Sequence, residues 1–444
     1  MPSVIPNRDV ALYDTGEVPI EASGWRAVSA PPAGYASLEQ DLESDVLIIG
    51  AGLAGASLAL HLAEAGVEVT LLEARQPGWG ASGRNAGHVL PMVKDMRAIE
   101  SFADGGRAFL ELFGEHHRLP FTLARRHGIE CDAAEVGYLH AMRSKGAFER
   151  FSRQAVAQAE RLGQRVELLD GAAMREQTGS RAYPFGVWNA AGGRINPYRF
   201  TLGMVAAAHR LGARVYGDSA ALTLTPEGRR WRVETARGSV RCERVVLCTN
   251  AYSGDLVPVL AGGCYPLTAY ALMTQPLPRE LREVIMPGRA VLAQEPVDLN
   301  PLVVDGQHRL IMASIPSRRR PADAAWHFRH HLRWLHRTWP QSRHIELSLA
   351  HYWTGRVALR DQAFPGVYEA APGLYGLMHF NAWGNIMAPL LGMRLAQGLV
   401  EDRLDRMPFP LMPPRAVAYP GKQGLLIRRG LIPAARMAQT LGMI

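Results

Sequence analysis

The sequence predicts an α/β protein in which a lobe built on a parallel sheet is interleaved with a second lobe of mixed or antiparallel sheet and helices. Three observations predict this fold class. Residues 45–73 have a strand–helix–strand pattern, helical stretches dominate residues 96–190, and Val245–Thr249 is a strand-like run typical of a chain re-entering the first sheet. The length of 444 residues suits two or three lobes, at about 150 residues per domain.

The first unit is a β-α-β motif. Val46–Ile49 form a short apolar run, as expected for a strand buried on both faces, and glycines follow it directly. A helical stretch covers Ser57–Ala65 and ends at Gly66, and Val67–Glu73 is the second strand. Strands joined through a helix in this way run parallel.

The remaining elements predict an interleaved order. Helices are expected at Arg107–Phe113, Gly146–Leu162 and Thr201–Leu211, and a His/Arg-rich helix at Ala324–Trp339. We therefore divide the chain into an N-terminal arm (1–43), a first lobe (44–95, 190–264 and 351–405), a second lobe (96–189 and 265–350) and a C-terminal tail (406–444).

Composition excludes several classes of protein. With 48% hydrophobic and 20% charged residues, the chain is expected to be globular rather than disordered or fibrous. The net charge of +8 is scattered along the chain without a recognition motif, so we expect no nucleic-acid binding. Four cysteines without C-x-x-C spacing suit buried thiols in a reducing compartment. The first residues do not resemble a signal peptide, and a cytoplasmic location is the simplest expectation.

The segment GAGLAG predicts a Rossmann-like dinucleotide site. Gly50 permits the tight turn, Gly52 lets the backbone approach a pyrophosphate, and Gly55 lets the helix pack on the strand. The N-terminus of the following helix points its N–H groups at the phosphates. Glu73 ends the second strand, where a carboxylate accepts hydrogen bonds from the adenosine ribose. The alternative is a purely structural turn with a surface carboxylate, and we favour the dinucleotide site because the motif follows a strand and opens a helix.

A second segment, WGASGRNAG at residues 79–87, resembles a nucleotide-contact segment of the D-amino-acid-oxidase-like FAD oxidoreductases. Within that superfamily it is most similar to the gamma-glutamylputrescine oxidoreductase group. Further similar segments are GRINP (193–197), CTNAY (248–252), TQPL (274–277) and WTG (353–355). The resemblance spans about residues 35–405, and it implies that the first lobe binds FAD and the second lobe binds substrate.

The resemblance also implies the cofactor contacts. FAD would be held without a covalent link, with Ser82 to Gly87 on the side that runs from pyrophosphate to flavin and the backbone of Ala221 at the adenine. An ordinary glycine loop is the alternative for residues 82–87. The implied contacts are Gly50, Gly52, Leu53, Ala54, Gly55, Glu73, Ala74, Arg75, Gly80, Ala81, Ser82, Arg84, Asn85, Ala86, Gly87, Ala221, Thr249, Asn250, Gly355, Asn381, Ala382, Trp383, Gly384, Asn385 and Ile386.

One segment departs from the family. Where relatives have a loop similar to G-Y-S-G-H-G-V over the flavin, this chain has FNAWGNIM at residues 380–387. An apolar-faced helix follows, and its N-terminus would stabilise negative charge at the flavin N1–C2=O edge. Trp383 and Asn381 would reshape the substrate face, or would instead be a core aromatic and a capping amide. His88 is a second substrate-facing candidate, although we favour a core or loop histidine there.

The chemistry implied by the family is hydride transfer from a carbon bearing an amine to flavin N5, which leaves an imine. The flavin carries this chemistry, and no catalytic residue stands out in the sequence. The electron acceptor is oxygen, for which Lys94 is a remote activating candidate, or another carrier. A non-amine substrate and a structural flavin without turnover are the alternatives.

Three further features carry weaker expectations. Gly424–Arg436 suits a tail packed on its own body better than a membrane-surface helix. His327–Trp334 suits a solvated helix face better than a metal site, because no nearby carboxylate or cysteine completes a ligand set. A small amine or amino acid is the expected partner, and the sequence leaves a homo-oligomer open.

Overall fold

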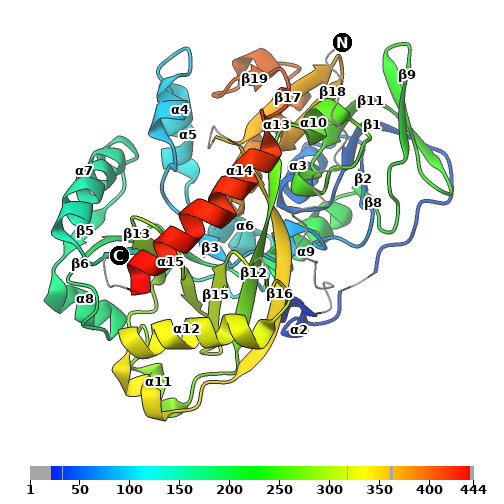
Figure 1. Ribbon diagram of the computed structural model, residues 1–444. Helices are drawn as coiled ribbons and strands as arrows, with labels where there is room; N and C mark the ends of the chain where they lie inside the picture. The colour runs from blue at the N-terminus through cyan, green and yellow to red at the C-terminus, as the bar shows by residue number, and fades with distance from the viewer. Residues whose placement is uncertain (1–21, 33, 318, 361–363, 441–444) are drawn as a thin grey trace.

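The computed structural model describes residues 22–440 except 33, 318 and 361–363. The predicted arm therefore lies partly outside the described residues, as does the end of the tail. The α/β fold class is confirmed: two large sheets lie side by side, with helices around them (Figure 1).

The first sheet has nine strands around a parallel centre. Its central strands are all parallel, so they can be joined only through crossover segments. In spatial order the strands are β19 (Leu411–Met412), β17 (Gly366–Ala371), β18 (Leu374–Met378), β11 (Ser239–Leu247), β1 (Leu42–Ile49), β2 (Val69–Leu72) and β8 (Arg214–Tyr216), while β10 (Arg230–Glu234) pairs with β11 and β9 (Thr223–Glu227) pairs with β10.

The second sheet has eight strands and is antiparallel except where β13 and β4 run parallel. This is the mixed or antiparallel sheet expected for the second lobe. In spatial order it contains β16 (Leu349–Leu359), β12 (Tyr265–Thr274), β15 (Leu310–Ser314), β14 (Leu302–Val304), β13 (Val291–Glu295), β4 (Tyr138–Met142), β6 (Phe185–Asn189) and β5 (Val166–Leu169). A short ladder between β3 (His88–Val89) and β7 (Gly193–Arg194) completes the pairing.

The predicted return to the first lobe at residue 351 differs from the observed strand pairing. β16 forms a long antiparallel ladder with β12, and this ladder satisfies its backbone within the second sheet. The first strand that rejoins the nine-stranded sheet after it is β17. No strand was predicted at 351–359, and this segment was assigned to the first lobe.

Three helices cover the nucleotide end of the first sheet. α3 (Leu53–Glu64) packs between α9 (Pro197–Arg210) and α13 (Gly384–Val400). The α3–α13 crossing is close, because a Cβ on Gly392 would lie 3.0 Å from Ser57 Cβ. The Ser57 hydroxyl also donates to the Pro389 carbonyl at 2.8 Å. α13 therefore has a fixed position, and so does the loop that precedes it.

The other helices are divided between the two lobes. The helices between residues 96 and 126 share the core of the first sheet with α3 and α13, although 96–189 was predicted to belong to the second lobe. α12 packs beside the second sheet near β16 (Figure 1). The helices are α2 (Gly24–Ala27), α4 (Met96–Glu100), α5 (Arg107–His116), α6 (Leu119–Arg126), α7 (Lys145–Arg161), α8 (Gly171–Thr178), α10 (Pro258–Ala261), α11 (Arg279–Arg282), α12 (Ala324–Thr338), α14 (Pro420–Leu426) and α15 (Ile432–Thr440), with a π-helical turn at Ile427–Leu431.

The C-terminal helices lie across one face of the body (Figure 1). Ala435 is buried, and Arg436 Nη2 donates to the Ile315 carbonyl at 2.8 Å, so the tail packs on its own chain as expected. Leu426 and Met437 stay exposed on this segment. In the part of the chain that the structure describes, no helix combines the length and apolar character needed to cross a bilayer.

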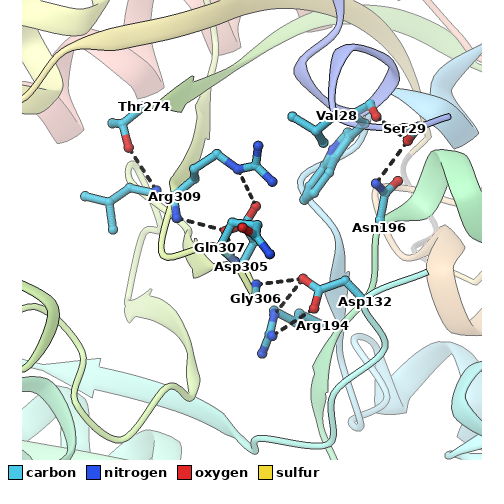
Figure 2. Close-up of polar contacts among 12 residues, drawn as sticks. Val28, Ser29, Asp132, Arg194, Asn196, Thr274, Asp305, Gly306, Gln307 and Arg309 are labelled. Carbon is cyan, nitrogen blue, oxygen red and sulfur yellow. Dashed lines mark hydrogen bonds and ion pairs between the residues drawn. The ribbon is translucent and has the colours of Figure 1, made fainter. Parts of the chain in front are cut away.

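A charged contact joins the two lobes close to β7. Figure 2 shows Asp132 accepting hydrogen bonds from Arg194 and from the backbone N–H of Gly306. The Arg194 Nη2 to Asp132 Oδ1 distance is 3.1 Å, and the guanidinium is buried. Gly306 belongs to the β14–β15 turn, where Asp305 accepts from Arg309 and the Gln307 backbone. This turn of the second sheet is thereby fixed to the strand that leads into α9.

Candidate active site

The glycine turn between β1 and α3 has the geometry that the motif predicts. Gly50 has φ +106°, a region that disfavours side chains. A Cβ on Gly55 would lie 2.0 Å from the Gly50 carbonyl oxygen, and one on Gly52 would lie 2.7 Å from Ser82 Oγ. Ser82 Oγ itself accepts the backbone N–H of Leu53 at 2.8 Å. The turn therefore brings bare backbone at the start of α3 against the second glycine segment.

Glu73 closes this end of the site. Its two carboxylate oxygens accept the backbone N–H groups of Ala51 at 2.8 Å and Arg75 at 3.0 Å. Burial is the largest influence on this carboxyl and raises its pKa. The Ser219 N–H donates to the Glu73 carbonyl at 2.9 Å, so the stretch that contains Ala221 runs beside Glu73 at the same sheet edge. Both predicted adenosine contacts lie at this edge.

The segment 79–87 is fixed by partners from distant parts of the chain. Arg84 Nη1 donates to the Thr354 carbonyl at 2.8 Å, and its guanidinium lies over the Trp79 ring at 4.9 Å. Two indole N–H groups donate hydrogen bonds to carbonyls of this segment. Trp25 donates to the Asn85 carbonyl at 2.7 Å, and Trp353 donates to the Arg84 carbonyl at 2.8 Å. The arm and the second sheet thus set the path of this segment.

A cavity of 440 Å³ lies where these segments meet the second sheet. The cofactor residues predicted from the sequence that line it are Gly52, Leu53, Ala54, Ala81, Ser82, Arg84, Asn85, Ala86, Asn250, Gly355, Asn381, Ala382, Trp383, Gly384, Asn385 and Ile386. The predicted residues outside its lining are Gly50, Gly55, Glu73, Ala74, Arg75, Gly80, Gly87, Ala221 and Thr249, most of them near the glycine turn and its sheet edge.

The loop that replaces the family pattern closes one side of the cavity. Asn381 and Ala382 have φ of 49° and 58°, which is uncommon for residues with a Cβ. α13 starts at Gly384 and no side chain caps it, so its first N–H groups meet the cavity lining directly. Trp383 is 3% exposed and packs on Phe113 with 5.7 Å between ring centroids, while its edge reaches the cavity. The tryptophan thus belongs largely to the core.

Lys94 ties this loop to the opposite wall. Its Nζ donates to the carbonyls of Asn381 at 3.2 Å and Ala382 at 3.1 Å. The ammonium lines the cavity, where enclosure by protein lowers its pKa to about 8. A lysine that the sequence offered only as a remote candidate is therefore part of the site.

His88 faces the same cavity. Its Nδ1 is 3.1 Å from the Tyr138 hydroxyl, and its Nε2 is buried without a hydrogen-bond partner. Burial, followed by the charges of Lys94 and His140, lowers its pKa to about 3, so the imidazole is neutral at physiological pH. The structure places His88 where a ligand can reach it, and this position supports the substrate-facing prediction.

Several cavity residues were not found from the sequence. Tyr138 lies on β4 of the second sheet, and Asp298 lies in the loop between β13 and β14. Tyr270 on β12 forms part of the same wall. None stands in a recognisable motif, and each reaches the cavity only through the pairing of the second sheet.

The structure corrects the prediction made for the histidine-rich helix α12. We expected a solvated face, but His327 and His331 are fully buried. His331 Nε2 is 2.8 Å from the Tyr270 hydroxyl, and His327 Nε2 accepts the Ser317 N–H at 3.0 Å. The face that carries residues 327 and 331 packs towards β12 and β16, where these hydrogen bonds offset burial. Among the described residues, no three potential ligands gather around a metal position.

The cavity suits a flavin dinucleotide. The glycine turn is tight because a Cβ at any of its three glycines would meet neighbouring protein atoms at 3.0 Å or less. A turn of this kind lets bare backbone approach a pyrophosphate. Buried polar atoms at the other end, His88 Nε2 and Asn385 Oδ1, have no protein partner and line the cavity. Such atoms are costly unless a ligand or water satisfies them. A long ligand with phosphates at one end and a polar ring at the other meets both requirements.

Comparisons with known proteins agree with this geometry. The family model described as FAD dependent oxidoreductase, DAO, matches residues 45–398. The chain is 29% identical over 404 residues to gamma-glutamylputrescine oxidoreductase of Escherichia coli (strain K12), covering 87% of this chain and 93% of that relative.

Two solved structures have the same fold. Glycine oxidase from Bacillus cereus has a TM-score of 0.67 and 20% identity, covering 83% of this chain and 99% of that chain. The fructosyl amine:oxygen oxidoreductase from Aspergillus fumigatus has a TM-score of 0.63 and 18% identity, covering 84% and 89%.

Proposed function

Because the chain belongs to the DAO family of FAD-dependent oxidoreductases, we propose that it oxidises a C–N bond of an amine or amino acid to an imine. The family resemblance expected from the sequence is confirmed. The observation that carries the proposal is the cavity itself, in which the FAD segments form one wall and the second sheet forms the other. The names of the relatives, a glutamylputrescine oxidoreductase and a glycine oxidase, support a C–N bond as the target.

FAD, when bound, supplies the hydride acceptor at N5 of its isoalloxazine. The residues of this chain hold it at three places. Backbone groups from Gly52 to Gly55 would bind the pyrophosphate, and Glu73 would bind the ribose hydroxyls. The uncapped first turn of α13 would donate N–H groups to the pyrimidine edge, where negative charge develops on reduction.

We propose that FAD is held without a covalent link. Cys248 is the thiol that lines the cavity, and complete burial raises its pKa far above the ordinary value, so it stays protonated and a poor nucleophile. His88 Nδ1 is engaged with Tyr138. Precipitating the yellow protein with acid should release the flavin into the supernatant, and flavin retained in the pellet would contradict this part of the proposal.

The second sheet orients the substrate and excludes water. Tyr270, Ala271 and Ala313 give the cavity an apolar wall, and polar groups gather at His88, Lys94 and Asp298. Hydride loss needs a neutral amine held at short range with its C–H directed at the acceptor, and a closed wall of this kind supplies orientation and a dry site. The chain's own contribution is therefore placement and protonation control, with no covalent role for a side chain.

We propose that oxygen is the electron acceptor and that Lys94 is the cation that activates it. It lies in the cavity beside the loop over the expected flavin position, and part of its population is charged near pH 8. A charged ammonium there would favour electron transfer to oxygen by stabilising a developing anion. Peroxide release that is lost in Lys94→Met, while flavin reduction by substrate persists, is the expected result.

Anaerobic titration of the flavin tests the reaction class. Primary and secondary amines and amino acids should bleach the flavin absorbance, whereas alcohols and hydroxy acids of matched size should not. Bleaching by non-amines alone would replace the proposal with oxidation of another substrate class. If no compound bleaches a flavin that dithionite reduces readily, the chain holds FAD without turnover.

A further inference from the structure

A carboxylate stands in the cavity without a cation to balance it. Asp298 lines the cavity, in the loop that follows β13. No ion pair joins it to another residue in the described part of the chain, and its hydrogen bonds come from the backbone groups of Gln294 and Asn300. The neighbouring Glu295 differs, because its carboxylate is 3.0 Å from His140 Nδ1.

The surroundings make an unbalanced carboxylate costly. Burial is the largest influence on Asp298, followed by the charge of Glu295, and both raise its pKa well above the ordinary value. The side chain keeps an exposed surface and lines the cavity, so a ligand can reach it. A carboxylate in such a place is stabilised most by a cation that enters the cavity.

The cations already in the cavity are engaged elsewhere. Lys94 donates to the loop carbonyls of Asn381 and Ala382. Arg84 holds the Thr354 carbonyl, and Arg356 lies over the Tyr252 ring. The charge of Lys94 reaches Asp298 but is the smallest of its influences. The protein therefore offers Asp298 a distant cation, and not a partner in contact.

A second unpartnered group faces the same space. His88 Nε2 is buried, lines the cavity and has no hydrogen-bond partner. Since the imidazole is neutral, a tautomer whose Nδ1–H donates to Tyr138 leaves a lone pair on Nε2. An acceptor nitrogen and a carboxylate in one cavity match the three N–H donors of an alkylammonium group.

We propose that Asp298 and His88 form an ammonium subsite, so that the substrate class is amines that enter the cavity as cations. Such an amine gives one N–H proton to the Asp298 carboxylate and becomes neutral before its C–H bond is broken. This inference rests on the proposed function, because it names the substrate for the same cavity. It assigns specificity to the second sheet: the loop after β13 would choose the charge of the ligand, while the FAD segments supply the chemistry. Carboxylates without an amine would be repelled from the same place.

Ligands that lack an α-hydrogen test the subsite apart from turnover. tert-Butylammonium, neutral tert-butanol and anionic pivalate share a tert-butyl group and differ in charge, and none has an α-hydrogen to give up as hydride. Their dissociation constants for the FAD-loaded protein can be read from the shift of the flavin absorbance. In the wild type, tert-butylammonium should bind more tightly than the other two. Absence of saturable binding of the cation would overturn the inference.

Asp298→Asn keeps the size of the side chain and removes its charge. It should weaken the binding of tert-butylammonium about 10- to 100-fold, as expected for the loss of a charged hydrogen bond, and should strengthen the binding of pivalate. Asp405→Asn, on an exposed carboxylate outside the cavity, is the matched control and should change the binding of neither ligand. Equal weakening of cation and anion would show that Asp298 only supports the cavity wall, and would overturn the inference.

A second variant keeps the test open if Asp298→Asn does not fold. Lys94→Gln retains an amide N–H for the loop carbonyls and removes the competing positive charge. It should tighten the binding of tert-butylammonium and weaken the binding of pivalate. The opposite pair of changes would refute the subsite. Failure of the proposed oxidation is a separate outcome, because it appears as unbleached flavin with every amine while these binding constants are still measurable.

Discussion

Replacing Gly55 with alanine separates cofactor binding from folding. A Cβ at this position would lie 2.0 Å from the Gly50 carbonyl oxygen and 3.2 Å from Ile48 Cγ2. Contacts below 3.0 Å are essentially absent from real structures, so α3 and the turn must separate by about 1 Å. The severe contact is with the Gly50 carbonyl, which is backbone and cannot rotate away as a side chain could.

The two consequences differ in size. Overpacking costs about 1–3 kcal/mol, and alanine returns up to about 1 kcal/mol through its higher helix propensity. The net loss of stability is therefore about 0–3 kcal/mol. The same 1 Å shift removes backbone N–H groups at residues 52–54 from the pyrophosphate. If two charged hydrogen bonds of about 1.5–3 kcal/mol each are lost, FAD affinity falls about 100- to 10,000-fold.

Titration of apo-protein with FAD and urea denaturation of the same preparations measure both quantities. Gly146→Ala in α7 is the matched control, since it also lies within a helix and its Cβ would meet only Arg150 Nη1, at 3.5 Å. The control should gain stability and bind FAD as the wild type does. FAD binding of wild-type strength in Gly55→Ala would refute the close-approach argument, and so would a loss of stability larger than the loss of affinity.

Four further predictions follow from single contacts. Glu73→Gln should weaken FAD binding about 10- to 100-fold in a fluorescence titration, because one charged acceptor for the ribose hydroxyls is lost. Unchanged affinity would place the ribose elsewhere. Asp132→Asn should lower the free energy of unfolding by about 1–3 kcal/mol, since it leaves the buried Arg194 without a counter-charge while asparagine tolerates the φ of 47°; an unchanged urea midpoint would contradict this. Pivalate affinity should fall as pH rises through about 8, because Lys94 loses its charge there; the Lys94→Gln variant should lack this step, and a wild-type profile that is flat would exclude Lys94. Trp383→Ala should cost about 3–5 kcal/mol in stability, since most of the ring packs in the core, and a loss below about 1 kcal/mol would mean that the ring faces ligand.

Local patterns predicted the nucleotide half of the fold well. The apolar run, the glycine turn and the helix of the first β-α-β unit are encoded within about thirty residues, so neighbouring residues suffice to identify them. The helix starts at Leu53 and not at Ser57, because the glycine segment itself forms the first turn.

The second sheet was less accessible to sequence analysis. The strand at 349–359 was not predicted, and its pairing with β12 depends on a partner about 80 residues away, for which the pattern carries no signal. The histidines of α12 show the same limit. Their spacing predicts that residues 327 and 331 share a face, but only the neighbouring sheet decides that the face is buried.

The interleaved chain explains why the cofactor segments are short and far apart in sequence. Each of them follows or adjoins a strand end: Gly50–Gly55 follows β1, Thr249 and Asn250 follow β11, and the loop 380–383 follows β18. Parallel neighbours bring these carboxyl ends to one edge of the sheet, where a ligand can touch all three. Gly355 and the indole of Trp353 reach the same edge from the second sheet. Cavity residues such as Asp298 belong to that second sheet and its loops, and because no glycine pattern is needed to place a carboxylate in a wall, they leave no motif in the sequence.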